Sequence, residues 1–350
     1  MTDITHSLQT SVQTAYAQHT PLQIVGGQSK TFYGRASTGQ VLNTAAHQGI
    51  IDYEPTELVI TARAGTPLAT IQQILAERGQ WLAFEPPAFG ESATFGGTIA
   101  CGLSGAARPY HGAMRDFVLG VKCLNGQGDI LQFGGQVMKN VAGYDVSRLM
   151  VGALGTLGVL LEISCKVMPI LPEQTTRILS CSLTEALEHM TFWGNQTIPL
   201  TASCYIDGKL YLRLNGVSIQ SAKQKIGGET LADADTFWAD LREQRLAFFQ
   251  TTSPLWRLSV PPTTPPLSLA GESLIEWGGG LRWLKSNATA KEIRASVAAV
   301  GGHATLFKGG DRHSAIFHPL PTPLDALHQR LKQQFDPKGI LNPQRMAQAW

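Results

Sequence analysis

The sequence predicts an α+β protein of two domains, and three observations carry this prediction. The chain has 350 residues, more than the roughly 100–200 residues of a typical single domain. Residues 58–80, LVITARAGTPLATIQQILAERGQ, join a strand pattern to an amphipathic helix across a glycine turn. Residues 116–133 alternate apolar and polar side chains around Asn125–Gly126 and Gln127–Gly128, which is typical of a β-hairpin.

The elements of the first domain are expected in the following order. A helix is predicted from Ser7 to Gln18, and PLQIVGG, residues 21–27, is predicted as a short strand that ends in glycines. The strand at residues 58–64 is followed by a turn at residues 65–67 and a helix. The apolar face of that helix is formed by Leu68, Ile71, Ile74 and Leu75.

The second domain is expected to begin where the glycine density falls, near Pro169 to Pro172. The predicted domains are therefore residues 1–170 and 171–350. Strands are predicted in LSCSL (179–183) and ASCYIDGKLYLRL (202–214), and a helix in ADTFWADLREQRL (234–246). The PPTTPP stretch, residues 261–266, is predicted as a rigid loop inside this domain.

Composition and charge exclude several classes of function. Charged residues make up 15% of the chain, below the usual value of about 25%; either Gln, Thr and Ser replace charges, or cofactor and partner proteins cover the surface. With a net charge of +2 and no run of basic residues among aromatic ones, the chain lacks the charge pattern of a nucleic-acid-binding protein.

Neither a signal peptide nor a membrane span is expected. The first 20 residues lack a basic start and an apolar core. The most apolar segment, Leu149–Leu161, is interrupted by glycines and shorter than the roughly 20 residues that span a bilayer. We therefore expect a cytoplasmic protein, located at the inner membrane only through partners.

The cysteines and histidines predict no metal site. Cys101, Cys123, Cys165, Cys181 and Cys204 are scattered singly, without C-x-x-C pairs, and are expected to be buried free thiols. The spacing of His303, His313 and His318 fits no common ligand pattern. Any iron–sulfur cluster is expected on another chain.

Three glycine-rich stretches in the first domain predict a bound ligand. They are VGGQSK (25–30), ATFGGTIACGLSG (93–105), and the stretch around the glycines at 152, 155 and 158. Consecutive backbone N–H groups in such loops can bind an anion such as pyrophosphate. Taken alone, VGGQSK could equally be a tight turn or an anion-binding loop. It matches neither the Rossmann nor the P-loop pattern. Three such stretches together favour contact with an extended ligand.

These motifs resemble a known family. The sequence contains P-x-x-G-x-x-A-T-F-G-G-T-I-A, R-x-x-x-G-x-x-R-D-x-V-L-G and K-N-V-A-G-Y-D-x-x-R-L-M-V-G-x-x-G-T-L-G-V. Over Pro21–Pro169, these motifs are similar to the FAD-binding PCMH-type domain of vanillyl-alcohol oxidase, D-lactate dehydrogenase and UDP-N-acetylmuramate reductase types. LKQQFDPKGILNP, Leu331–Pro343, resembles the closing motif of FAD-linked glycolate and D-lactate oxidoreductases. As a whole, the sequence resembles the E-subunit family of bacterial glycolate oxidases.

The resemblance implies two α+β subdomains with FAD extended between them, followed by a smaller α+β cap-like domain. The VGGQSK loop lacks the histidine to which some relatives attach flavin, so FAD is expected to be bound non-covalently. The resemblance places the pyrophosphate at Gly26, Gly27, Gln28, Ser29, Thr94, Gly96, Gly97 and Thr98. It places the isoalloxazine near Gly102, Ser104 and Arg108, and the adenine end near Gly158 and Val159. Asp145 of the G-Y-D motif is expected to be structural.

Catalysis by this chain alone is put in doubt by two departures from the family. Its 2-hydroxy-acid members carry a G-E-H-G-x-G-type motif, whereas this chain has GGHATLFKGGDRH at residues 301–313. Ala153 and Leu154 replace the usual Ser and Glu. Arg108 and Arg282 could clamp a carboxylate with His303 as the base, or each could have an ordinary structural role.

The expected function is therefore that of an FAD-binding subunit of a glycolate oxidase, or glycolate dehydrogenase, complex. Glycolate would be oxidised to glyoxylate, with electrons passing through flavin to an iron–sulfur subunit; a larger FAD-binding catalytic subunit is the other expected partner. The alternatives are a stand-alone oxidoreductase of another 2-hydroxy acid and a structural subunit with an inert FAD pocket. The expected docking region lies beyond Pro172, where Trp193, Trp238 and Trp256 are either docking or core residues.

Overall fold

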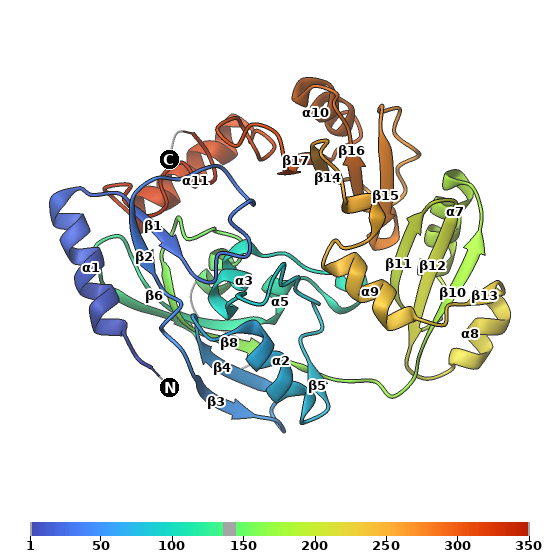
Figure 1. Cartoon of the computed structure of the whole chain (residues 1–350), viewed down its shortest axis with the longest axis horizontal. Helices are drawn as coiled ribbons and strands as arrows, with labels where there is room; N and C mark the ends of the chain where they lie inside the picture. Colours follow the sequence, from blue (N-terminus) through green and yellow to red (C-terminus); the bar gives the residue numbers. More distant parts are fainter. Residues whose placement is uncertain (1, 136–144, 349–350) are drawn as a thin grey trace. The chain divides into compact units, whose positions relative to one another are not determined.

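The computed structural model describes residues 2–135 and 145–348, and the chain forms two compact units (Figure 1). The first unit comprises Met1–Leu103, Ala113–Pro169 and Arg312–Trp350, and the second comprises Ser104–Gly112 and Ile170–Asp311. The sequence predicts a single boundary between the domains, near Pro169 to Pro172. The structure instead places Ser104–Gly112 with the second unit and returns Arg312–Trp350 to the first, where its backbone pairs with Leu22.

The first unit is built on a five-stranded antiparallel sheet with strand order β3-β4-β8-β6-β7. The strands are β3 (Ile50–Glu54), β4 (Val59–Arg63), β8 (Val159–Lys166), β6 (Val118–Leu124) and β7 (Ile130–Gly134). β6 and β7 form the predicted hairpin. Its turn is closed by Asn125, whose side-chain oxygen accepts from the backbone N–H groups of Gln127 and Asp129, both at 2.9 Å.

Helices and two short strand pairs complete this unit. The helices are α1 (Thr5–Gln18), α2 (Leu68–Ala76), α3 (Phe95–Cys101), α5 (Met114–Phe117), α6 (Val146–Met150) and α11 (Thr322–Phe335). The pairs are parallel β1 (Leu22–Val25) with β2 (Gln40–Asn43), and antiparallel β5 (Gln80–Trp81) with β9 (Met168–Pro169). The apolar face of α2, with Leu68, Ile71 and Leu75, packs into the main core against the sheet.

The second unit is built on an eight-stranded sheet with order β13-β10-β12-β11-β15-β16-β14-β17. Its strands are β10 (Gln174–Ser180), β11 (Leu200–Ile206), β12 (Lys209–Asn215), β13 (Glu229–Thr230), β14 (Leu255–Ser259), β15 (Glu272–Glu276), β16 (Leu281–Lys285) and β17 (His303–Lys308). Its helices are α4 (Arg108–His111), α7 (Leu183–Gly194), α8 (Ile219–Ile226), α9 (Ala234–Arg242) and α10 (Ala290–Ala298), with short 3-10 turns at Ala247–Phe249 and Trp277–Gly279.

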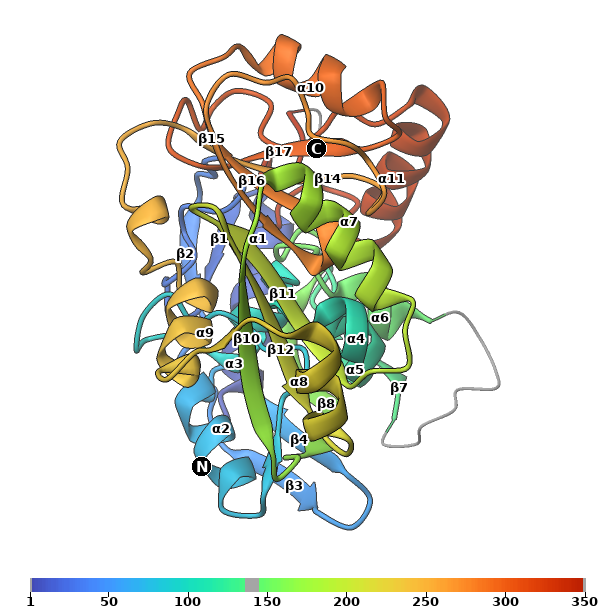
Figure 2. The same ribbon diagram turned by 90° about the vertical axis from the view of Figure 1, so that its right-hand side faces the viewer.

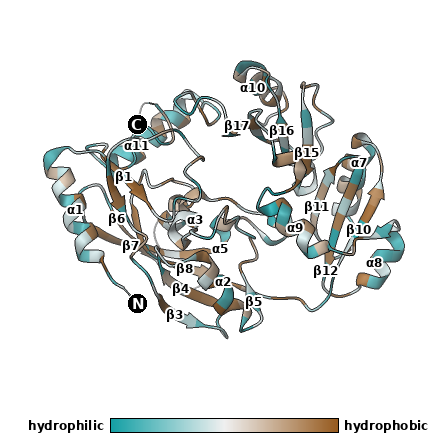
Figure 3. Ribbon diagram, viewed as in Figure 1, coloured by the Kyte–Doolittle hydropathy of each residue, from teal (hydrophilic) through white to brown (hydrophobic). Residues whose placement is uncertain are grey.

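The alternation of side chains along β12 positions the helices of the second unit. Leu210, Leu212 and Leu214 pack with side chains of α7 and α8, while Tyr211 stacks on Phe237 of α9. Figure 2 shows α9 on the opposite side of the sheet from α7 and α8. Colouring by hydropathy shows apolar residues on the strands of this unit and polar residues on α8 and α9 (Figure 3).

Most predicted elements are confirmed, and the differences have local causes. The predicted strand at residues 179–183 ends at Ser180, because Ser182 caps α7 in a reciprocal pair of hydrogen bonds with Glu185. The predicted helix 234–246 ends at Arg242. Trp238 and Trp256 are core residues, 6% and 3% exposed, so these two do not mark a docking surface.

The remaining predictions concern cysteines and membrane segments. Cys123, Cys165 and Cys204 are buried free thiols, as predicted, whereas Cys101 and Cys181 are partly exposed. Within residues 2–135 and 145–348, no helix is both long and apolar enough to cross a membrane. The K-N-V-A-G-Y part of the third family motif, residues 139–144, lies outside the described residues.

Candidate functional site

The main candidate site is a cavity of about 290 Å³ in the first unit. Its walls come from β1 and the loop that follows, the first turns of α3, the loop at Leu154, and the C-terminal segment. The lining residues are Gln23, Ile24, Val25, Gly26, Gly27, Gln28, Ser29, Lys30, Thr31, Ala36, Ser37, Thr94, Gly97, Ala100, Cys101, Leu154, Asn342 and Arg345.

The loop after β1 needs its two glycines because other chain segments lie directly against it. A Cβ atom at Gly27 would lie 1.4 Å from the carbonyl oxygen of Ser92, and one at Gly26 would lie 2.6 Å from Oγ1 of Thr94. The next residue, Gln28, has a φ of 58°. This left-handed residue turns the chain sharply, and successive N–H groups in such turns form anion-binding concavities. The loop Gly26–Ser29 is hereafter called the cradle.

The start of α3 forms the opposite wall of the cavity. Thr94 is the N-cap of α3, and its hydroxyl accepts a hydrogen bond from the N–H of Gly97 at 3.2 Å. Gly96 packs on Ala64, where an added Cβ would lie 2.5 Å from the Ala64 Cβ. A Cβ at Gly97 would meet only Thr94 Oγ1, at 3.0 Å, because its other side is the cavity.

The cavity carries positive charge. Lys30 and Arg345 line it, and no Asp or Glu side chain does so among the described residues. Lys30 donates to the carbonyl of Ala88 at 3.0 Å. Cys101 is partly exposed as a whole residue, but its thiol lies in a buried environment that raises its pKa to about 11, so this cysteine is neutral at physiological pH. The arrangement favours an anionic ligand.

A smaller cavity of about 70 Å³ adjoins the first. The two share the lining residues Ile24, Gly26, Gly97, Ala100, Leu154 and Asn342, and Gly96, Gly155 and Gly158 line the smaller one alone. Gly155 has a φ of 72° and lies against Asn342, where an added Cβ would be 2.7 Å from Nδ2. The stretch of glycines at 152–158 therefore lets the chain pass close to both the cavity and the C-terminal segment.

Comparison with known proteins shows to which family the chain belongs. The FAD binding domain family model matches residues 4–134. Over 346 residues the sequence is 50% identical to glycolate oxidase subunit GlcE of Escherichia coli (strain K12), covering 98% of this chain and 97% of the relative. The chain belongs to the GlcE family.

Two further similarities place this GlcE family member among related proteins. It is 35% identical over 121 residues to glycolate oxidase subunit GlcD of Bacillus subtilis (strain 168), covering 34% of this chain and 25% of the relative. The solved structure of alkyldihydroxyacetonephosphate synthase superposes with a TM-score of 0.65 at 15% identity, covering 97% of this chain and 76% of that one, and supports the fold alone.

A GlcE family member is an oxidoreductase subunit that binds FAD, and the cavity fits that cofactor. FAD carries a pyrophosphate with two negative charges, and the cavity offers a cradle of backbone amides, two cations and, among described residues, no carboxylate. Its apolar members, such as Ile24, Ala100 and Leu154, suit the uncharged parts of an extended ligand.

Eight of the predicted cofactor residues of the first unit line one of the two cavities, and three do not. Gly26, Gly27, Gln28, Ser29, Thr94 and Gly97 line the larger cavity, and Gly96 and Gly158 line or adjoin the smaller one. Thr98 and Val159 are buried and line neither. Gly102, with a φ of 65°, ends α3 and packs on the backbone of Gly152.

Ser104 and Arg108 belong to the second unit. The Arg108 guanidinium lies over the ring of Trp277, 4.4 Å from its centroid, and the indole N–H donates to the carbonyl of Gly105 at 2.9 Å. These contacts give Arg108 a stacking role within the unit.

The two other candidate catalytic residues are also in the second unit. Arg282 is 3% exposed, and its guanidinium donates to the backbone carbonyls of Gly279, Pro265 and Thr264. These bonds hold the PPTTPP loop against β16, so a carboxylate clamp at Arg282 is not supported. His303 begins β17 and is exposed. Asp145, predicted to be structural, caps α6 by accepting from the N–H of Arg148 at 3.2 Å.

Among the lining residues, the sequence did not predict Lys30, Leu154, Asn342 and Arg345. Lys30 is the last residue of the VGGQSK stretch, and Leu154 lies between Gly152 and Gly155. Asn342 and Arg345 lie more than 300 positions from the cradle, and the only available signal was the resemblance of Leu331–Pro343 to a closing motif.

Proposed function

We propose that this chain is the FAD-binding subunit of a complex that oxidises glycolate to glyoxylate and passes the electrons through flavin to an iron–sulfur partner. The observation that carries the proposal is a glycine-lined, positively charged cavity in a chain that matches GlcE over nearly its whole length. The substrate and the electron path are inferred from this kinship.

The residues of the first unit have a binding role in this proposal. Backbone N–H groups of the cradle hold the pyrophosphate, and Gly97 leaves room for the ligand beside α3. When bound, FAD supplies a two-electron acceptor. The chain holds this acceptor and orients it.

The proposed partners are a larger FAD-binding catalytic subunit and an iron–sulfur subunit. The five free cysteines of this chain are dispersed between Cys101 and Cys204, and three of them are fully buried, so they do not resemble a cluster-binding set. The iron–sulfur cluster that accepts the electrons is therefore carried by a second chain in this proposal. We place the complex in the cytoplasm, with contact to the inner membrane only through partners.

Acid precipitation of the FAD-loaded chain is expected to release all of its FAD into the supernatant. The cradle and the following Lys30 include no histidine, the side chain to which some relatives of this fold attach flavin. The absorbance spectra of supernatant and pellet provide the measurement. Yellow colour that stays in the pellet would contradict non-covalent binding.

The isolated chain is expected to reduce its flavin with glycolate slowly or not at all, and the reconstituted complex to do so rapidly. A positioned acid or base contributes roughly 10²–10⁴-fold to such a reaction, and this chain has GGHATLFKGGDRH at residues 301–313 in place of the histidine motif of the 2-hydroxy-acid oxidoreductases that it resembles. Stopped-flow absorbance with and without partner subunits gives the comparison.

Two outcomes of this experiment, and one of size-exclusion chromatography, separate the alternatives. Rapid bleaching of the flavin in the isolated chain would favour a stand-alone oxidoreductase. A complex in which this chain's FAD is never reduced would favour a structural subunit. A monomer that binds neither partner at micromolar concentration in size-exclusion chromatography would contradict the subunit assignment.

A further inference from the structure

The C-terminal segment Ile340–Met346, hereafter the C-terminal hook, is built into the wall of the FAD cavity. Its first residues run beside β1: the N–H of Leu22 donates to the carbonyl of Ile340 at 2.7 Å, and the N–H of Asn342 donates to the carbonyl of Leu22 at 2.9 Å. Two of its side chains, Asn342 and Arg345, line the cavity. The hook thus reaches the cofactor site from the far end of the chain.

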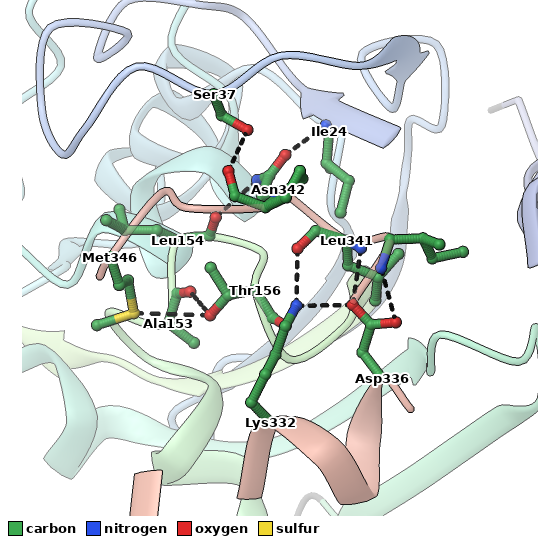
Figure 4. Close-up of polar contacts among 12 residues, drawn as sticks. Ile24, Ser37, Ala153, Leu154, Thr156, Lys332, Asp336, Leu341, Asn342 and Met346 are labelled. Atoms are coloured by element: carbon green, nitrogen blue, oxygen red, sulfur yellow. Dashed lines mark hydrogen bonds and ion pairs between the residues drawn. The ribbon is translucent and has the colours of Figure 1, made fainter. Parts of the chain in front are cut away.

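Asn342 ties two walls of the cavity together. Its Oδ1 accepts from the N–H of Ile24 at 2.7 Å, and its Nδ2 donates to the carbonyl of Leu154 at 2.7 Å (Figure 4). Ile24 precedes the cradle, and Leu154 lies in the glycine stretch on the other side. The hydroxyl of Ser37 adds a bond to the carbonyl of Pro343 at 2.9 Å. The hook is therefore fixed at both sides of the site.

Arg345 is oriented by the loop that follows the cradle. Its guanidinium donates to the carbonyls of Tyr33 and Arg35, both at 2.6 Å, and Thr31 at 3.0 Å. The N–H of Arg35 donates in return to the carbonyl of Arg345 at 2.9 Å. A guanidinium has further N–H donors beyond these three bonds, and the residue borders the cavity.

The charge of Arg345 has no counter-ion within the described chain. Its contacts are backbone carbonyls, with no ion pair to an Asp or Glu, and burial lowers its pKa. A half-buried cation without a neighbouring anion is unfavourable unless a ligand supplies the anion. Phosphate is a fitting counter-ion, because the planar guanidinium forms strong charge-assisted hydrogen bonds with it.

We propose that Arg345 is the counter-ion of the FAD pyrophosphate, and that the C-terminal hook is consequently a part of the cofactor site whose docking and FAD binding stabilise each other. The proposal rests on placing the pyrophosphate at the cradle. The reciprocal stabilisation follows from linkage, because a ligand that binds only the docked arrangement favours that arrangement. Arg345 acts here as a binding residue and takes no part in the oxidation.

Two substitutions at Arg345 separate its charge from its hydrogen-bonding role. Arg345→Lys and Arg345→Gln both lose the hydrogen bonds that the guanidinium makes to the loop at residues 31–35, but only Arg345→Lys keeps the positive charge. In fluorescence titrations of the apo-protein with FAD, we expect Arg345→Gln to bind about tenfold more weakly than Arg345→Lys. Arg330→Gln, an exposed arginine on α11, is the matched control and should bind like the unmodified chain.

The outcome of the titration decides the proposal in either direction. Equal affinity of Arg345→Lys and Arg345→Gln for FAD would overturn it, because the residue would then act only as a structural link. If both variants fail to fold, amide hydrogen exchange of the unmodified chain decides instead: FAD should slow exchange at residues 340–346 as well as at 26–31. Protection of the cradle without protection of the hook would also overturn the proposal. Neither readout depends on glycolate turnover, so a failure here is distinct from a failure of the proposed function.

Discussion

Replacing Gly27 with alanine is expected to abolish stable FAD binding and to destabilise the first unit. The added Cβ would lie 1.4 Å from the carbonyl oxygen and 2.5 Å from the carbonyl carbon of Ser92. Both are backbone atoms, so no rotation of a side chain relieves the clash, and the cradle must move away from Ser92. The hydrogen bond from the Ser92 hydroxyl to the carbonyl of Gly27 is then lost as well.

The expected size of the effect follows from the cost of overpacking. Inserting a methyl group without room costs about 1–3 kcal/mol, and we expect the upper end, since backbone rather than side chain must shift. The melting temperature of the apo-protein should fall by roughly 6–12 °C at about 2–4 °C per kcal/mol. FAD affinity should fall by at least about hundredfold. Thermal melts followed by circular dichroism and fluorescence titrations with FAD provide the two measurements.

Gly97→Val is the informative comparison, because it adds bulk to the same cavity with less strain. A Cβ at Gly97 meets only Thr94 Oγ1, at 3.0 Å, so the apo-protein should stay within about 1 kcal/mol of the unmodified chain. FAD should nevertheless be lost, since the side chain fills ligand space. Gly194→Ala, where nothing lies within 4 Å of the new Cβ, is the control. Full flavin occupancy in Gly97→Val would show that this wall does not face the cofactor.

The contrast between these glycines explains how much of the site could be predicted from sequence. A glycine stretch such as VGGQSK can be recognised from the sequence because its composition is unusual over a few neighbouring residues. The sequence does not say which glycine faces a ligand and which faces protein: Gly96 packs on Ala64, whereas its neighbour Gly97 opens to the cavity. That distinction depends on chain segments that local patterns do not place.

The same limit applies to the fold and to the charged residues. Hairpins and amphipathic helices were predicted well because turn residues and periodicity are local properties. The return of residues 312–350 to the first unit was not predicted, because it rests on pairing between Leu22 and Ile340 across the whole chain. Arg282 looked like a candidate ligand for a carboxylate, and only the structure shows that its donors are engaged by backbone carbonyls.

Lys332→Met is expected to destabilise the first unit by about 3–5 kcal/mol, because it leaves a buried carboxylate without its cation. Lys332 and Asp336 are 4% and 1% exposed, and Nζ lies 2.6 Å from Oδ2. Nζ also donates to the carbonyls of Thr156 and Leu341, at 2.8 and 2.9 Å. Asp336 in turn accepts from the N–H groups of Ile340 and Leu341, at 3.0 and 2.7 Å (Figure 4).

A double-mutant cycle tests whether the loss comes from the unpaired charge. Asp336→Asn removes the negative charge but keeps a side chain of similar size. The double variant Lys332→Met with Asp336→Asn should therefore lose less free energy of unfolding than the sum of the two single losses. We expect a coupling energy of about 1–3 kcal/mol. Arg245→Met, which breaks a partly exposed pair with Asp240, is the control and should cost no more than about 1 kcal/mol. Because the pair anchors the turn that leads into the C-terminal hook, Lys332→Met should also weaken FAD binding. Additive losses in urea unfolding would mean that Lys332 contributes packing and backbone hydrogen bonds rather than the balance of a buried charge.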